Sequence, residues 1–219
     1  MHDGNNVIED ITEAIDEDSR LRTKSPQEVP AKKKHRGPKK LVKVHGRPRE
    51  ERPYLILNIY GQPVGPTDEV VDEFTQFLGT VARNSELAPL NYVEWPSLPT
   101  HNKIWDYVQE KYLVPEEGRK WVMETVNYAW RMHKCRTKKK HFYAFDTDEQ
   151  RMIERLKTMP KTHFEDLLKY WHLTTTEEES QTNKKNRQKA EDIRTMGPKS
   201  YARLRHKLKQ EDPNKKEPS

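Results

Sequence analysis

The stretch EGRKWVMETVNYAWRMHKCR, residues 117–136, decides how this chain folds. Its apolar residues recur every three or four positions, the repeat of an α-helix that packs through one face. That face holds Val122, Val126, Ala129, Trp130 and His133, and the opposite face holds Lys120, Asn127, Arg131, Lys134 and Lys138. The spacing predicts a long amphipathic helix with an apolar side in a core and a basic side at the surface.

Two shorter helices are expected ahead of it. Residues 68–84 carry acidic residues in the first turn, where they complement the helix dipole. Their apolar stripe comprises Val70, Phe74, Phe77, Leu78 and Val81. A second stripe, formed by Ile104, Trp105, Val108 and Tyr112, stops before Pro115. The prolines around Trp95 predict an ordered connector between these two helices.

One strand is expected before the helices. The segment 54–60, YLILNIY, is β-branched and aromatic and is closed by Gly61 and Pro63, as is typical of a short strand. Upstream, Leu41, Val42 and Val44 are expected to pair with it as a hairpin.

Three capping boxes predict helices in the last third of the chain, because each satisfies free backbone N–H groups at a helix start. They are Thr147 with Gln150, Thr162 with Glu165, and Thr176 with Glu179. The second helix carries a core-facing stripe of Phe164, Leu167, Leu168 and Trp171. The third has almost no apolar residue up to Ala190, so it either reaches into solvent or binds something.

The composition limits the core to part of the chain. Of 219 residues, 32% are hydrophobic and 35% are charged, and the mean hydropathy is −1.16. We expect a mainly α fold, with a small helical domain at residues 36–175 that starts with a short strand or hairpin. A disordered tail, first acidic and then basic, is expected at residues 1–35. A basic helical extension with a disordered end is expected at residues 176–219.

The positive charge is concentrated in blocks. The net charge is +6 and the pI about 9.2, a balance that favours polyanionic partners. Residues 1–30 carry 3 Lys or Arg against 8 Asp or Glu, whereas residues 31–52 carry 10 against 2. In the second block Lys32, Lys33, Lys34 and Arg36 suit a nuclear import receptor or phosphate groups. The alternative is a solvated linker.

Three basic segments are candidates for binding double-stranded DNA. The first holds Arg36, Lys39 and Lys40; the second holds Arg131, Lys134, Arg136, Lys138, Lys139 and Lys140; the third holds Lys184, Lys185, Asn186, Arg187, Lys189, Arg203 and Arg205. Lysines suit phosphate contacts, whereas Asn and Arg can also make bidentate contacts with bases.

The aromatic and apolar residues beside these segments leave alternatives open. Phe142 and Tyr143 either stack on bases or anchor the helix end in the core. A stripe of Tyr201, Leu204 and Leu208 docks either on the core or on another copy of the chain, so a homo-oligomer stays open.

No catalytic or cofactor site is expected. A two-metal nuclease core needs three carboxylates around two metal ions, normally on a larger sheet than this sequence predicts. Asp68, Asp72, Asp106 and Asp146 are better explained as helix caps or surface charge. The histidines lack the spacing of a zinc site, and Cys135 is expected to be a passive thiol. No apolar run is long enough for a membrane span, so we expect a soluble intracellular protein.

Several short motifs, taken in their order, resemble the plant CACTA-type (En/Spm, Ptta) transposon proteins. They are Arg36-Gly37-Pro38, residues 58–66, Phe77-Leu78-Gly79 with Arg83, Trp95, Lys103-Ile104-Trp105, Trp130-Arg131, residues 164–171, residues 183–187 and Lys199-Ser200-Tyr201-Ala202. The resemblance implies a DNA-associated, non-catalytic role in the nucleus, at transposon ends and beside a separate catalytic transposase. The alternative is a nuclear protein-interaction module whose basic segments serve import only.

Overall fold

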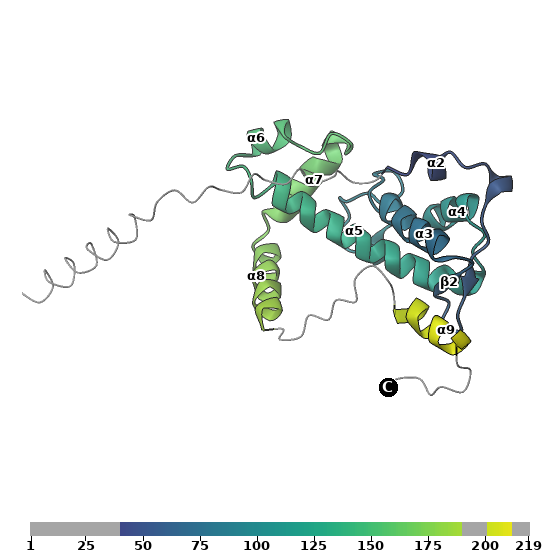
Figure 1. Ribbon diagram of the computed structural model, residues 1–219. Coiled ribbons are helices and arrows are strands. Elements are labelled where there is room, and N and C mark those ends of the chain that lie inside the picture. Colours follow the sequence, from purple (N-terminus) through teal and green to yellow (C-terminus); the bar gives the residue numbers. More distant parts are fainter. Residues whose placement is uncertain (1–39, 190–200, 212–219) are drawn as a thin grey trace, which may run out of the picture. The chain divides into compact units, whose positions relative to one another are not determined.

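The computed structural model describes residues 40–189 and 201–211, apart from the side chain of Arg187, and its helices are arranged around α5 (Arg119–His141; Figure 1). The predicted tail, with Lys32 to Arg36 and Lys39, lies outside the described residues. So does the segment 190–200.

The long helix predicted from residues 117–136 is confirmed as α5, which runs on to His141. Val122, Val126 and Trp130 are buried, as the apolar spacing requires. The expectation that Lys134 and Lys138 lie on the solvent face is wrong, because Lys138 is buried and Lys134 half-buried. A long side chain can bury its methylene stem wherever its ammonium finds polar or aromatic partners.

Helix α3 (Asp68–Val81) confirms the second predicted helix and packs against α5. Thr67 forms its N-cap, since its hydroxyl accepts a hydrogen bond from the backbone N–H of Val70 at 3.3 Å. The buried face comprises Val71, Phe74, Phe77, Leu78 and Val81, so Val71 takes the place expected for the half-buried Val70. The first-turn acids, Asp68 and Glu69, are present as expected.

Helix α4 (His101–Lys111) confirms the third predicted helix, and Tyr112 at its end completes the core. The ring of Tyr112 lies 4.7 Å from that of Phe74 and 5.3 Å from that of Phe77, measured between centroids. Its hydroxyl donates to Glu73 at 2.8 Å, and Arg47 donates to the same carboxylate at 2.6 Å. This fully buried tyrosine therefore keeps its polar atom bonded.

The short sheet is an antiparallel hairpin of β1 (Ile56–Leu57) and β2 (Pro63–Gly65). The predicted strand is present but shorter than residues 54–60. Its expected pairing with residues 41–44 is wrong, because Val42–His45 forms the helical turn α2 with Val44 buried. The strand that pairs with β1 is β2, which follows it after a tight turn. In this turn the Oδ1 of Asn58 accepts hydrogen bonds from the N–H groups of Tyr60 and Gln62, each at 3.0 Å.

Gly61 allows this turn to close. Its φ is +71°, and a Cβ atom there would overlap the backbone carbonyl of Glu117. Any other residue would therefore be strained in its backbone and would collide with the chain before α5.

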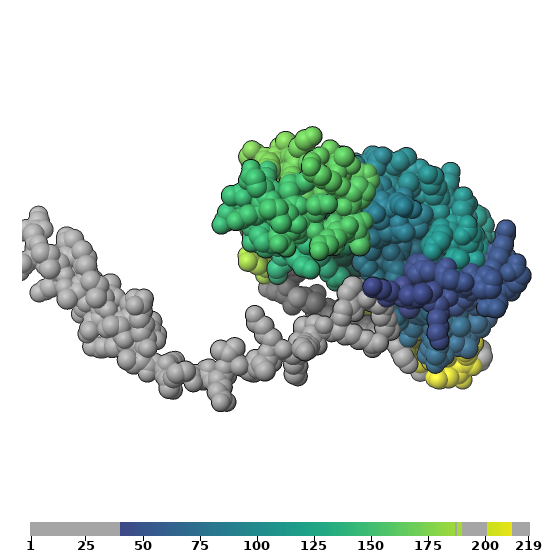
Figure 2. All heavy atoms as spheres, turned by 90° about the horizontal axis from the view of Figure 1, so that it is seen from above, coloured from purple at the N-terminus to yellow at the C-terminus, as the bar shows by residue number. Residues whose placement is uncertain are grey.

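The proline-rich connector between α3 and α4 lies over the core and includes the short turn η3 (Trp95–Ser97). It also contacts the later part of the chain. The hydroxyl of Ser85 donates to the carbonyl of Thr158 at 3.0 Å, and Asn91 donates to Asp166 at 3.3 Å. Figure 2 shows the surfaces of these two segments meeting, blue-green against green.

Helices α6 (Asp148–Ile153) and α7 (Lys161–Trp171) follow α5. The cap of α6 is confirmed, since the hydroxyl of Thr147 accepts from the N–H of Gln150 at 3.4 Å. Helix α7 exists with its predicted buried stripe, Phe164, Leu167, Leu168 and Trp171, but it begins after Pro160. Thr162 is therefore not its cap, because a fixed proline φ already sets the start.

Two helices complete the described chain. Helix α8 (Thr174–Gln188) begins before Thr176, whose hydroxyl donates to the carbonyl of Tyr170 at 3.0 Å instead of capping. Helix α9 (Tyr201–Glu211) packs against β2. The mainly α fold with a small hairpin is thus confirmed. No helix of the described segments is long and apolar enough to span a membrane.

Three short helical turns link these elements. They are η2 (Arg49–Glu51), η3 and η4 (Glu116–Gly118), which leads directly into α5. In η4, Gly118 packs beneath Leu57 of the hairpin, so the turn holds β1 against the start of α5.

Candidate nucleic-acid interface

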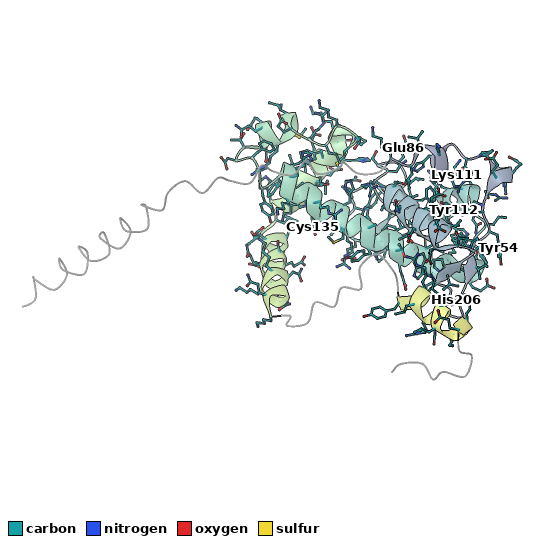
Figure 3. The ribbon with its side chains drawn as sticks, viewed as in Figure 1. Tyr54, Glu86, Lys111, Tyr112, Cys135 and His206 are labelled. Atoms are coloured by element: carbon teal, nitrogen blue, oxygen red, sulfur yellow. The ribbon has the colours of Figure 1, made fainter. Side chains whose placement is uncertain are left out.

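The basic residues at the end of α5 divide between two faces of the helix. The exposed ones are Arg131, Arg136, Lys139 and Lys140. Cys135 and Tyr128 are also exposed, and Figure 3 labels Cys135 on α5. These four side chains extend from one helix at positions where they can reach a polyanion together.

Lys134 has a structural role. Its ammonium donates to the backbone carbonyls of Tyr92 at 2.5 Å and Val93 at 3.3 Å, which ties the proline-rich connector to α5. The same nitrogen lies 5.0 Å from the ring centroid of Trp130 and 4.8 Å from that of Tyr170. Burial lowers the pKa of Lys134 to about 8. An ammonium with these partners is not available for a phosphate.

Lys138 is likewise engaged inside the protein. Its nitrogen lies 3.7 Å from a carboxylate oxygen of Glu177 on α8. It also lies 5.7 Å and 5.0 Å from the ring centroids of Phe142 and Tyr143. Phe142 is buried and anchors the helix end, which decides between its two expected roles, whereas Tyr143 is 47% exposed.

Tyr143 joins two of the segments that the sequence marked as basic. Its hydroxyl donates to Glu177 at 2.8 Å, and the ammonium of Lys184 lies 5.6 Å from its ring. The end of α5 and the exposed side of α8 are thereby brought together. On α8 the side chains of Lys184, Lys185 and Asn186 are exposed, and so is that of Lys189, one residue beyond the end of the helix. We call the exposed basic residues of these two helices the α5–α8 basic face.

Arg83 is a basic residue that the sequence did not single out as a site. It lies two residues beyond α3, half-buried, and its pKa is lowered by burial and then by the nearby guanidinium of Arg136. Burial, followed by the charges of Arg83 and Arg136, lowers the pKa of His133 to about 4. Within residues 40–189 and 201–211, neither arginine forms an ion pair with a carboxylate.

This cluster of Arg83, His133 and Arg136 depends on the packing of α3 against α5. Arg83 and Arg136 are far apart in the sequence, and Arg83 has no basic run around it that would predict a binding site. Like charges held together without an acid cost free energy. A bound polyanion would relieve that cost.

The remaining candidates lie on α9, away from α5. Arg203 is buried: it donates to Asp72 at 2.7 Å, and its guanidinium lies 3.5 Å from a carboxylate oxygen of Asp68. Lys207 donates to Asp68 at 2.7 Å. The prediction of Arg203 as a DNA contact conflicts with this burial. Arg205, by contrast, lies at the edge of a surface hollow.

Helix α9 docks through its charged residues and not through its apolar stripe. Tyr201 and Leu204 are 56% and 44% exposed, whereas Arg203 is 4% exposed. Of the two roles left open for the stripe of Tyr201, Leu204 and Leu208, docking on the core does not hold for Tyr201 and Leu204, because the ion pairs of Arg203 and Lys207 with α3 orient the helix the other way.

No group of three or more His, Cys, Asp or Glu side chains in the described segments is placed to hold a metal ion. The arrangement defines a class of protein: a helical domain that presents exposed basic residues from two neighbouring helices. Residues 160–219, which contain α7, α8 and α9, match a family model described as plant transposase (Ptta/En/Spm family). Residues 160–219 are thus similar to plant transposases, which confirms the resemblance for this part of the chain. No curated protein and no solved structure matches the chain.

Proposed function

We propose that this protein binds double-stranded DNA through phosphate contacts made by the α5–α8 basic face, with Arg83 at its edge. The observation that carries the proposal is the Arg83–His133–Arg136 cluster, whose arginines have no carboxylate partner among the described residues. Arg131, Lys139 and Lys140 extend it along α5, and Lys184 and Lys185 extend it onto α8. A row of phosphates supplies the missing negative charge and releases counterions on binding.

The contacts differ in what they can recognise. Lysine ammonium groups act as point charges with little geometric selectivity, so Lys139 and Lys140 suit any sequence. Asn186 on α8 is exposed and can pair with a base edge in the major groove. Lys134, Lys138 and Arg203 are left out of the proposed interface because each is engaged within the protein.

We place this activity in the nucleus, beside a separate catalytic transposase, with Lys32 to Lys34 and Arg36 as the import signal. The protein acts without chemistry of its own in this proposal. Asp68 and Asp72 on α3 form ion pairs with Arg203 and Lys207, so they are poor candidates for metal ligands.

The salt dependence of duplex binding tests the proposal. Full-length protein is titrated against a fluorescent duplex at several salt concentrations between about 50 and 200 mM, where phosphate contacts lose affinity steeply. In the Lys139→Gln/Lys140→Gln variant we expect weaker binding and a shallower slope of log K against log salt, by about 0.9 for each phosphate that the protein no longer neutralises.

The matched control is Lys43→Gln/Lys103→Gln, which removes the same charge from exposed lysines that lie outside α5 and α8. It should keep the slope of the parent. Equal slopes for the two variants would mean that only net charge matters and that the α5–α8 basic face is not the interface.

A nuclear protein-interaction module remains the second candidate, favoured by the exposed Tyr201 and Leu204 on α9. Apolar side chains left in water on one face of a helix are typical of a contact surface. This alternative predicts no measurable duplex binding even at about 50 mM salt, with Tyr201→Ser/Leu204→Ser lowering any self-association seen by light scattering.

A further inference from the structure

A hollow of about 260 Å³ lies between the turn of the hairpin and α9. Residues 57–60 line one side, and Ala202, Arg205, His206 and Lys209 line the other. Figure 3 labels His206 on α9 next to the hairpin. The α5–α8 basic face contributes no residue to this hollow.

Both walls of the hollow are held in place. On the hairpin side, the Oδ1 of Asn58 accepts hydrogen bonds from the backbone N–H groups of Tyr60 and Gln62. The Nδ2 of Asn58 donates to the side-chain oxygen of Gln62 at 3.0 Å. On the helix side, the ion pairs of Arg203 and Lys207 with α3 hold α9 against the domain. A site between two fixed walls loses little freedom when a ligand binds.

The side chains that line the hollow combine aromatic, apolar and basic groups. Tyr60 is 57% exposed and Ile59 84%, although both follow a strand of the hairpin. Arg205, His206 and Lys209 carry donor groups, and no carboxylate is among the lining residues that the structure describes. An aromatic ring beside such donors is the combination that binds a base together with its phosphate.

We propose that this hollow binds an unpaired nucleotide, with its base stacked on Tyr60 and its phosphate held by Arg205. In a duplex each base is covered on both faces by its neighbours, so an exposed tyrosine ring can stack only on a base that has left the helix or belongs to a single strand. The site adds single-stranded nucleic acid to the duplex binding proposed above and rests on that function for its class of ligand.

Fluorescence anisotropy with the full chain tests this site, using a short single-stranded oligothymidylate and a duplex as separate probes. Tyr60→Ala should weaken single-strand binding about five- to hundredfold, the range for loss of one stacked base. It should leave duplex affinity unchanged. Arg205→Gln should also weaken the single strand selectively and lower its salt slope.

The control is Tyr54→Ala, which removes a tyrosine of similar exposure, 58%, that does not line the hollow. It should bind both probes like the parent. As a direct readout, an oligonucleotide that carries iodouracil should cross-link to Tyr60 under ultraviolet light. Thermal melts verify that each variant is folded.

The outcomes separate the two proposals. Single-strand binding that survives Tyr60→Ala unchanged, in protein that still binds duplex, overturns the hollow and leaves the duplex function standing. If the protein binds a single strand through Tyr60 but binds no duplex, the duplex function is overturned and the hollow stands. If polyglutamate displaces the oligonucleotide as well as unlabelled oligonucleotide does, the hollow recognises acidic chains in general and base stacking is refuted.

Discussion

Replacing Trp130 by Ala tests the centre of the fold. The side chain is 2% exposed, and its ring centroid lies 5.7 Å from that of Trp95. Its indole N–H donates to the carbonyl of Pro89 at 3.1 Å, which holds the proline-rich connector against α5. The side chain therefore joins two segments that are not neighbours in sequence.

The expected loss of stability follows from these interactions. Truncating a buried Trp costs about 3–5 kcal/mol, because apolar area returns to water and a cavity is left behind. The unpaired carbonyl of Pro89 adds about 1 kcal/mol or more if water cannot reach it. Against a typical total of about 5–15 kcal/mol, Trp130→Ala should lower Tm by roughly 10–20 °C, or unfold the domain outright.

Thermal and urea melts followed by circular dichroism measure this destabilisation. Trp130→Phe keeps most of the apolar area but leaves Pro89 unpaired, so it should fall between the parent and the Ala variant. Tyr128→Ala serves as control, because Tyr128 on the same helix is 68% exposed and its removal should cost no more than about 0.5 kcal/mol. If Trp130→Ala melted like Tyr128→Ala, the core described around α5 would be wrong.

Three further predictions concern other residues. Burial holds the pKa of His133 at about 4, against an ordinary value of 6.5. The imidazole therefore takes up a proton when the protein unfolds between these two pH values. The free energy of unfolding should fall by about 2 kcal/mol as pH drops from about 6.5 to 4, after allowing for the partial exposure of the ring. Urea melts of His133→Gln should lack this part of the decline. Gly61→Ala should lower the free energy of unfolding by about 2 kcal/mol or more, because Gly61 has a positive φ and a methyl group there would meet the carbonyl of Glu117. Gly79 lies inside a helix with room for a methyl group, so Gly79→Ala should raise the free energy of unfolding by about 0.5–1 kcal/mol. Urea melts measure both changes. Lys134→Met should leave the salt slope of duplex binding unchanged, since its ammonium already binds two carbonyls; a shallower slope would return it to the interface.

The helices could be predicted because their signal is local. The repeat of Phe74, Phe77, Leu78 and Val81, or of Phe164, Leu167, Leu168 and Trp171, reports which face of each helix meets a core, whatever that core is. The cap at Thr147 is equally local, since donor and acceptor are three residues apart. Errors arose where a nearby alternative competed, as at Pro160, which starts α7 before Thr162 can cap it.

The pairing of the hairpin was beyond the sequence pattern. Apolar residues lie on both sides of β1 in the sequence, so either side could have supplied the partner strand. Residues 63–65 pair with β1 because Asn58 and Gly61 form a tight turn between the two strands. The upstream candidate, Val42–His45, became a helical turn whose His45 bonds Tyr107 and Thr80.

The surplus of Lys and Arg, its blocks along the chain and the faces of its helices were determined by the sequence itself. Which charges remain available was decided only by the tertiary structure. Lys134 is engaged because the connector carries two carbonyls to it, and Arg203 because α3 carries Asp68 and Asp72 to it. Arg83 gained importance because packing set it beside Arg136. Charge interactions depend on distance through space, and residues far apart in sequence acquire that distance only when the chain folds.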